Sequence, residues 1–146
     1  MPDTQHVTML LVEDDPGHAR LIERNLRRAG ITNEIITLTD GYTAVDYLFG
    51  EGQRRPLPLL VLLDLHLPGL SGVQVLERLK ADQTTKHIPV IILTTTDDPH
   101  EIERCYALGC NVYLTKPIAY EQFAEAIRQL GLFISIVKIP SGEVTP

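Results

Sequence analysis

The chain has 146 residues, of which 44% are hydrophobic and 22% are charged, and its formal net charge is -6 at pH 7. This length and composition indicate one globular domain and exclude a disordered or fibrous chain. The sequence has no basic run, no apolar run of membrane-spanning length and no signal-peptide core, so we expect a cytoplasmic protein that contacts neither nucleic acid nor membrane directly.

Apolar runs of strand length alternate with segments of helical periodicity along the chain. In chain order the sequence predicts strands at 8–13, 33–39, 59–64, 88–94 and 111–115, and helices at 16–30, 41–50, 71–82, 99–109 and 119–130. The strand at 59–64 is the most apolar, and it ends on a carboxylate, Asp64. Residues 1–7 are expected to be disordered or extended.

Five strands, each followed by a helix, predict parallel pairing with right-handed crossovers. The strands are nearly continuous in apolar residues, which is typical of a sheet that is covered on both faces. The predicted fold is therefore α/β, a doubly wound five-stranded parallel sheet of the flavodoxin-like kind, with strand order 2-1-3-4-5 and helices on both faces. These elements make up one predicted domain, residues 8–130.

Polar and charged residues stand at the carboxyl ends of the predicted strands. They are Glu13, Asp14, Asp15, Asp64, Thr94 and Lys116. In a doubly wound sheet these ends share one edge, where ligands bind. Clustered carboxylates repel one another unless a cation joins them, and Mg²⁺ (or Mn²⁺) with oxygen ligands suits this set. Lys116 can hold a phosphate oxygen, so the inventory suits phosphoryl transfer to a carboxylate nucleophile.

Four separated motifs coincide with four of these strand ends: "LLVEDD", "LLDLHLPGLSG", "PVIILT" and "YLTKP". In order and spacing they resemble the receiver domains of two-component response regulators, of the chemotaxis-regulator-like type. The resemblance covers about residues 8–130. It implies a phosphoacceptor signalling protein that assists its own Mg²⁺-dependent phosphorylation and dephosphorylation, and not a classical enzyme. It also implies that a histidine kinase is the phosphoryl donor.

The resemblance assigns roles to the residues that match the acidic motifs. Asp64 is the implied phosphoacceptor. The implied metal ligands are Glu13, Asp14, Asp64 and the backbone carbonyl of His66, with Asp14 the more direct ligand of the acidic pair.

The resemblance also assigns catalytic and switching roles. Lys116 and Thr94 act with Asp64 in the catalytic set, Thr94 is the switch hydroxyl, and Tyr113 is the switch aromatic. Phosphorylation is expected to draw Thr94 inward, to let Tyr113 turn in, and to change the surface formed by the fourth helix, the fifth strand and the fifth helix. Such coupling is typically about 1–3 kcal/mol, so we expect a population shift and not a new fold.

Simpler interpretations apply to other polar residues near the strand ends. Asp15 and Asp98 each precede a proline, which is typical of a helix N-cap. Cys105 and Cys110 fit no metal or redox spacing and are expected to be free thiols.

His66 departs from the polar amide that the family often has at its position. We expect its ring to point to solvent, so that only its carbonyl contributes to the site. The positions of His66 and Thr96 flank the path of water to a phosphorylated aspartate in this family. Their bulk is therefore expected to tune how fast the phosphate is lost.

Three other functions remain open for this inventory. A metal-dependent phosphatase with an aspartate nucleophile needs a second acid two residues later, where this chain has His66. A flavin or nucleotide binder needs a glycine-rich phosphate loop after the first strand, where this chain is acidic. A receiver that has lost phosphorylation and acts only by docking would keep the fold alone.

The segment 131–146, "GLFISIVKIPSGEVTP", adds apolar residues beyond the predicted domain. If the last helix continued past Gly131, one apolar stripe would contain Phe123, Ala126, Ile127, Leu130, Ile134 and Val137. A helix break at Gly131 followed by an extended arm is the alternative, and the tail could also pack on its own domain. We expect a homodimer or a partner contact through the last helix and this tail. The tail also resembles that of small stand-alone regulators paired with bacterial and cyanobacterial phytochromes, which implies a phytochrome-type kinase. Because the sequence ends at Pro146, the expected output is a protein contact or onward phosphoryl transfer.

Overall fold

The computed structural model describes residues 8–50, 57–58 and 60–130. In these ranges the chain forms one five-stranded parallel sheet with the strand order β2-β1-β3-β4-β5. The predicted fold class and strand order are confirmed. The predictions for residues 1–7 and for the tail 131–146 lie outside the described residues.

The strands and helices alternate as predicted, with bounds close to those expected. In chain order they are β1 (Thr8–Val12), α1 (Pro16–Arg28), β2 (Glu34–Leu38), α2 (Gly41–Phe49), β3 (Leu60–Leu63), α3 (Gly72–Ala81), β4 (Val90–Thr94), α4 (Pro99–Leu108), β5 (Val112–Thr115) and α5 (Tyr120–Gln129).

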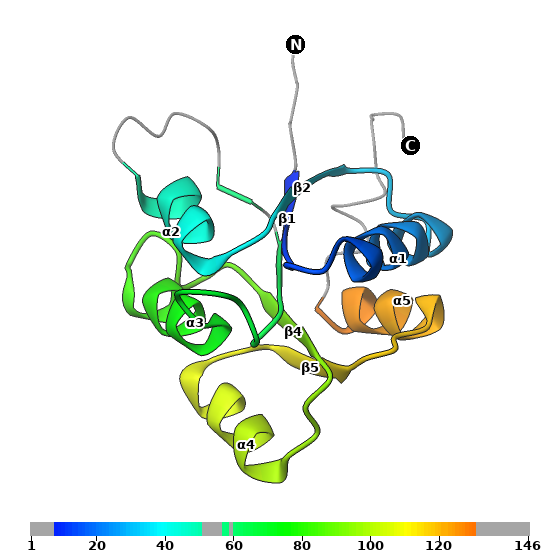
Figure 1. Cartoon of the computed structure of the whole chain (residues 1–146). Helices are drawn as coiled ribbons and strands as arrows, with labels where there is room; N and C mark the ends of the chain where they lie inside the picture. Colours follow the sequence, from blue (N-terminus) through cyan, green and yellow to red (C-terminus); the bar gives the residue numbers. More distant parts are fainter. Residues whose placement is uncertain (1–7, 51–56, 59, 131–146) are drawn as a thin grey trace.

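The helices cover the sheet in two layers (Figure 1). Helices α1 and α5 pack side by side on one face, and α2, α3 and α4 cover the other. The central strands β1, β3 and β4 are buried along their whole length, because both of their faces meet a helical layer. This explains why they are continuous apolar runs, whereas the edge strands β2 and β5 stay partly exposed.

The two helix starts predicted from Asp-Pro pairs are confirmed. The Asp15 carboxylate accepts from the backbone N–H groups of Gly17 and His18, and the Asp98 carboxylate accepts from that of His100. Both cysteines are free, as predicted, and both are buried. Among the described residues no helix has the length and apolar character needed to cross a membrane.

The apolar stripe predicted on the last helix packs against its own domain where the structure describes it. Phe123, Ala126 and Ile127 are buried in the cluster between α1, α5 and the sheet, and Leu130 packs against that cluster. This part of the stripe is therefore covered without a partner. Dimerisation through the last helix and the tail stays a prediction.

Helix α3 begins where it packs closely on the backbone that follows β3. A Cβ atom at Gly72 would lie 2.1 Å from the carbonyl oxygen of Asp64 and 2.6 Å from the Cα atom of Leu65. The Gly72 N–H also donates to the Leu65 carbonyl at 2.9 Å. Because only a residue without a side chain permits this approach, the start of α3 fixes the backbone at Asp64.

We expect Gly72→Ala to lower the free energy of unfolding by about 1–3 kcal/mol, since the added methyl group must push two backbone segments apart. Urea unfolding followed by circular dichroism measures this change. Gly17→Ala is the matched control, because its Cβ atom would approach only a side-chain oxygen of Asp15, at 3.3 Å. An equal loss of stability in both variants would contradict the close packing at Gly72.

Candidate functional site

Backbone hydrogen bonds at the carboxyl edge of the sheet position three charged residues. Glu13, Asp64 and Lys116 each follow the last residue of a strand, β1, β3 and β5 in turn. The N–H group of each donates to the carbonyl oxygen of the last residue of the neighbouring strand. The acceptors are Leu38 for Glu13 (2.9 Å), Val12 for Asp64 (3.1 Å) and Thr94 for Lys116 (2.8 Å). The parallel ladder thus extends one residue past each strand, and it brings residues from distant parts of the sequence to one edge.

The predicted acidic residues meet at this edge. Carboxylate oxygens of Glu13, Asp14 and Asp64 all lie within 4.8 Å of one another. Glu13 and Asp64 are buried, whereas Asp14 is exposed. Hard oxygen donors around one space, with one side open to water, fit a divalent cation that keeps part of its hydration shell. The contribution of the His66 carbonyl to such a site stays a prediction.

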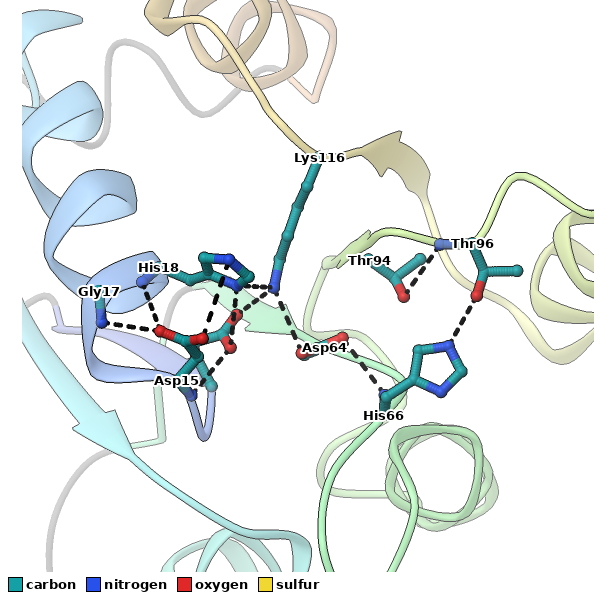
Figure 2. Close-up of polar contacts among 9 residues, drawn as sticks. Asp15, Gly17, His18, Asp64, His66, Thr94, Thr96 and Lys116 are labelled. Atoms are coloured by element: carbon teal, nitrogen blue, oxygen red, sulfur yellow. Dashed lines mark hydrogen bonds and ion pairs between the residues drawn. The ribbon is translucent and has the colours of Figure 1, made fainter.

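Lys116 joins the two buried acids. Its Nζ lies 2.6 Å from Glu13 Oε1 and 3.3 Å from Asp64 Oδ2, and Figure 2 shows its side chain reaching toward Asp64. The exposed fractions of the three side chains are 9% for Lys116, 1% for Glu13 and 7% for Asp64. Breaking a buried ion pair by removing one partner typically costs about 3–5 kcal/mol. The positive charge of Lys116 therefore stabilises both buried carboxylates, each of which would be unpaired without it.

Burial acts against the charged form of Glu13. It raises the pKa of Glu13 above the usual 4.5, while hydrogen bonds from Lys116 and from the Asp15 N–H lower the pKa and the nearby Asp64 charge raises it. Because this pKa is raised, the folded protein keeps a proton that the unfolded protein releases near pH 4.5. The stability that this proton gives is lost as the pH rises from there through the pKa of the folded state. Burial thus acts against an unpaired charge on Glu13, and the Lys116 ammonium 2.6 Å away offsets that charge.

His18, which the sequence analysis did not single out, also reaches the site. Its Nδ1 lies 3.1 Å from Lys116 Nζ and 3.8 Å from Glu13 Oε2, and its Nε2 lies 3.9 Å from Asp15 Oδ2 (Figure 2). One feature of the sequence could have indicated this contact: His18 stands three residues after the N-cap Asp15, in the first turn of a helix that begins at a strand end.

The His66 side chain is exposed, as predicted, but its ring also has a hydrogen-bond partner in the protein. The residue is exposed, yet its Nε2 lies 2.6 Å from Thr96 Oγ1, so the ring joins the loop after β3 to the loop after β4 (Figure 2). The His66 backbone N–H donates to Asp64 Oδ1 at 3.2 Å. The sequence did not predict the ring contact, because it joins two loops 30 residues apart.

Thr96 connects the two predicted switch residues. Thr94 is fully buried, and its Oγ1 lies 3.5 Å from the Thr96 N–H nitrogen, a long hydrogen bond. The Tyr113 hydroxyl donates to the Thr96 carbonyl at 2.8 Å. Burial raises the pKa of Tyr113 to about 12, so the phenol remains a donor at neutral pH. The contacts are in place, and the switching role of Thr94 and Tyr113 stays a prediction.

Known proteins resemble this chain in both sequence and structure. The family model of the response regulator receiver domain matches residues 9–128. Response regulator Rcp1 from Synechocystis sp. is 41% identical over 136 residues, which cover 91% of this chain and 92% of that protein.

Solved structures superpose on nearly the whole chain. A response regulator receiver domain from Rhodospirillum rubrum is 55% identical, with a TM-score of 0.73 and coverage of 92% of this chain and 97% of that one. The Mn²⁺-bound form of Rcp1 gives a TM-score of 0.74 at 34% identity and coverage of 92% and 99%. The phosphorylated cyanobacterial phytochrome response regulator RcpA gives 0.75 at 36% identity and coverage of 94% and 100%.

We expect Asp14→Asn to weaken the binding of Mg²⁺ or Mn²⁺ by about tenfold or more, because the number of charged ligands sets the affinity of such sites. Isothermal titration of the metal-free protein measures the affinity. Asp15→Asn is the control: this neighbouring carboxylate caps α1 outside the cluster, and asparagine can replace it as a cap. If both variants lost the same affinity, general surface acidity and not the cluster would account for binding.

Proposed function

This chain belongs to the response regulator receiver domain family, and on that premise we propose that Asp64 accepts a phosphoryl group from a histidine kinase. The observation that carries the proposal is the setting of the Asp64 carboxylate. It is buried at the end of β3, its Oδ2 lies 3.3 Å from the Lys116 ammonium, and two further carboxylates stand close enough to share one cation with it. A carboxylate held in this way is a fixed nucleophile next to positive charge.

In the proposed step, an oxygen of Asp64 forms a bond to phosphorus while the bond from phosphorus to the kinase histidine nitrogen breaks. Lys116 stabilises the charge on the transferred phosphoryl oxygens. The N–H of His66, which donates to Asp64 Oδ1, orients the carboxylate for attack. The product is an acyl phosphate on Asp64, and its hydrolysis by water ends the signal.

We propose Mg²⁺ as the cation, held by Glu13, Asp14, Asp64 and the carbonyl of His66. When bound, it supplies positive charge to the phosphoryl oxygens and orients them. Mg²⁺ usually takes one or two carboxylates and keeps several waters. The exposed Asp14 beside two buried acids suits that habit, and the Mn²⁺-bound form of the relative Rcp1 supports a divalent ion.

We assign the switch to Thr94 and Tyr113, coupled through Thr96. Thr94 Oγ1 accepts from the Thr96 N–H, so its own proton can be donated to a phosphoryl oxygen on Asp64. A shift of Thr94 toward that oxygen would pull on Thr96, whose carbonyl holds the Tyr113 hydroxyl. The change would then reach β5, a partly exposed edge strand, and α4, which packs beside it.

The proposed partner is a phytochrome-type histidine kinase in the cytoplasm. RcpA, which aligns along most of this chain, is a phytochrome response regulator. A homodimer through the last helix and residues 131–146 is a second proposed contact. Within the described part of α5 it would use the side opposite the buried Phe123, Ala126 and Ile127.

A phosphatase with its own external substrate is the alternative enzyme. It would need an acid two residues after Asp64, and His66 stands there with its ring bonded to Thr96. We therefore propose a phosphoacceptor that assists its own phosphorylation and dephosphorylation and does not act on other substrates.

Incubation with acetyl phosphate and Mg²⁺ is expected to add one phosphoryl group, measured as a gain in intact mass. Asp64→Asn should abolish the gain, because a neutral amide is a poor nucleophile, and so should the omission of Mg²⁺. Asp97→Asn, which changes an exposed acid outside the cluster, should keep it. The proposal is rejected if the mass of the wild type increases neither with acetyl phosphate nor with a phosphorylated kinase.

Thr96→Val is expected to shorten the lifetime of phosphorylated Asp64 by about fivefold, which corresponds to one hydrogen bond of about 1 kcal/mol. Valine keeps the size of threonine but cannot hold the His66 ring across the site, so water gains access. The intact mass, followed after removal of the donor, gives the rate.

His66→Phe and the double variant test whether the same contact is responsible. Both single variants and the double variant remove the same hydrogen bond, between His66 and Thr96. The double variant should therefore lose phosphate no faster than either single variant. Thr95→Val is the adjacent control and should behave like the wild type. Additive effects of Thr96→Val and His66→Phe would contradict a shared contact.

A further inference from the structure

The Lys116 ammonium has three N–H donors, and the described structure offers it three acceptors. Two are the buried carboxylates, Glu13 Oε1 at 2.6 Å and Asp64 Oδ2 at 3.3 Å. The third is His18 Nδ1 at 3.1 Å. A phosphoryl oxygen arriving on Asp64 therefore finds every ammonium proton already in use and must replace one of these acceptors.

The geometry fixes how His18 takes part in the resting site. An ammonium group only donates, so a hydrogen bond between Lys116 Nζ and His18 Nδ1 uses the ring tautomer with its proton on Nε2. The ring stands on the first turn of α1, where its own N–H donates to the Asp15 carboxylate at 3.1 Å. The contact thus ties the start of α1 to the residue after β5, 98 positions away in the sequence.

Of the three acceptors, His18 is the one most readily released. Glu13 is a buried anion at the shortest distance, and Asp64 is the residue that receives the phosphoryl group. The His18 side chain is neutral as an acceptor and 46% exposed, so water can replace its lost bond. A charged phosphoryl oxygen is also a stronger acceptor for an ammonium proton than an imidazole nitrogen.

We propose that His18 is a positioning residue for Lys116, which holds the third ammonium proton in the resting protein and yields it to the phosphoryl oxygen when Asp64 is phosphorylated. This inference rests on the proposed function of Asp64. No covalent bond of His18 changes: one hydrogen bond from Lys116 passes from an imidazole nitrogen to a phosphoryl oxygen.

A cavity next to His18 would give its released ring room to move. The ring and Lys116 lie at a cavity of about 210 Å³, whose other lining residues include Leu21 and Ile22 of α1 and Pro117 and Ile118 after β5. Once Lys116 lets go, the imidazole is free to turn within this cavity. The phosphorylation state of Asp64 is thereby transmitted to the surface between α1 and the loop after β5.

The direct test is long-range ¹H–¹⁵N spectroscopy of the histidine rings at alkaline pH, where imidazole is neutral. His18→Asn identifies the His18 signals by their loss. Spectra are recorded without metal, with Mg²⁺, and with Mg²⁺ plus beryllofluoride as the phosphoryl analogue. We expect the His18 Nδ1 signal to stay near its resting position with Mg²⁺ alone and to shift when beryllofluoride is added. In ¹H–¹³C spectra of the same samples, the methyl signals of Leu21 and Ile22 should shift with it.

Two results would overturn the exchange. Either the His18 ring is unchanged when beryllofluoride binds, or Mg²⁺ alone produces the whole shift. The mass gain with acetyl phosphate separates this failure from a failure of the proposed function. A wild type that takes up phosphate with an unchanged His18 ring refutes only the exchange, whereas one that neither takes up phosphate nor binds beryllofluoride refutes both.

Substitutions give an independent readout. His18→Leu removes the competing acceptor from an exposed helix position, and we expect beryllofluoride to bind about tenfold more tightly, the order of one hydrogen bond to a charged group. In His18→Asn the amide oxygen can take the place of Nδ1 and should restore an affinity near that of the wild type. His100→Leu, which changes an exposed histidine on α4, is the control. Unchanged or weaker binding by His18→Leu would contradict the proposal.

Discussion

The ion pairs of Lys116 are the constraint on which the rest of the site depends. Two buried carboxylates, Glu13 and Asp64, stand at adjacent strand ends, and one ammonium group lies within 3.3 Å of both. Without it, only the hydrogen bond from the Asp15 N–H would oppose the desolvation that raises the pKa of Glu13, and two buried carboxylates would lie close together without a cation. The fold makes this arrangement rigid, because the parallel ladder runs one residue past each strand.

Two chains of polar contacts lead away from Asp64 in different directions. One passes through Lys116 to His18 and reaches the cavity beside α1. The other passes through the backbone of His66, whose ring contacts Thr96, and the Thr96 carbonyl in turn accepts from Tyr113 of β5. We propose that charge added at Asp64 acts through both chains of contacts. This suits a signalling domain that must meet a donor and then a target.

Patterns that repeat within one element were predictable. The apolar runs gave the strands, the Asp-Pro pairs gave two helix starts, and the rule that parallel strand ends share an edge gathered Glu13, Asp64 and Lys116. The omissions concern side chains on loops and first turns. The bond of the exposed His66 ring to Thr96 was not predicted, and neither was the contact of His18 with Lys116. Both contacts join segments that sequence spacing does not relate.

The sequence by itself determined the class of the fold, the order of its elements and the chemical inventory at the strand ends. These follow from local periodicity and from the few ways in which alternating strands and helices can pack. Only the tertiary structure decided which acceptors share the Lys116 protons and which loop holds the Tyr113 hydroxyl. Such contacts depend on side-chain rotamers and on distances of a few ångströms between segments that are remote in the sequence. Burial at the sheet edge strengthens these contacts, because the local dielectric is low.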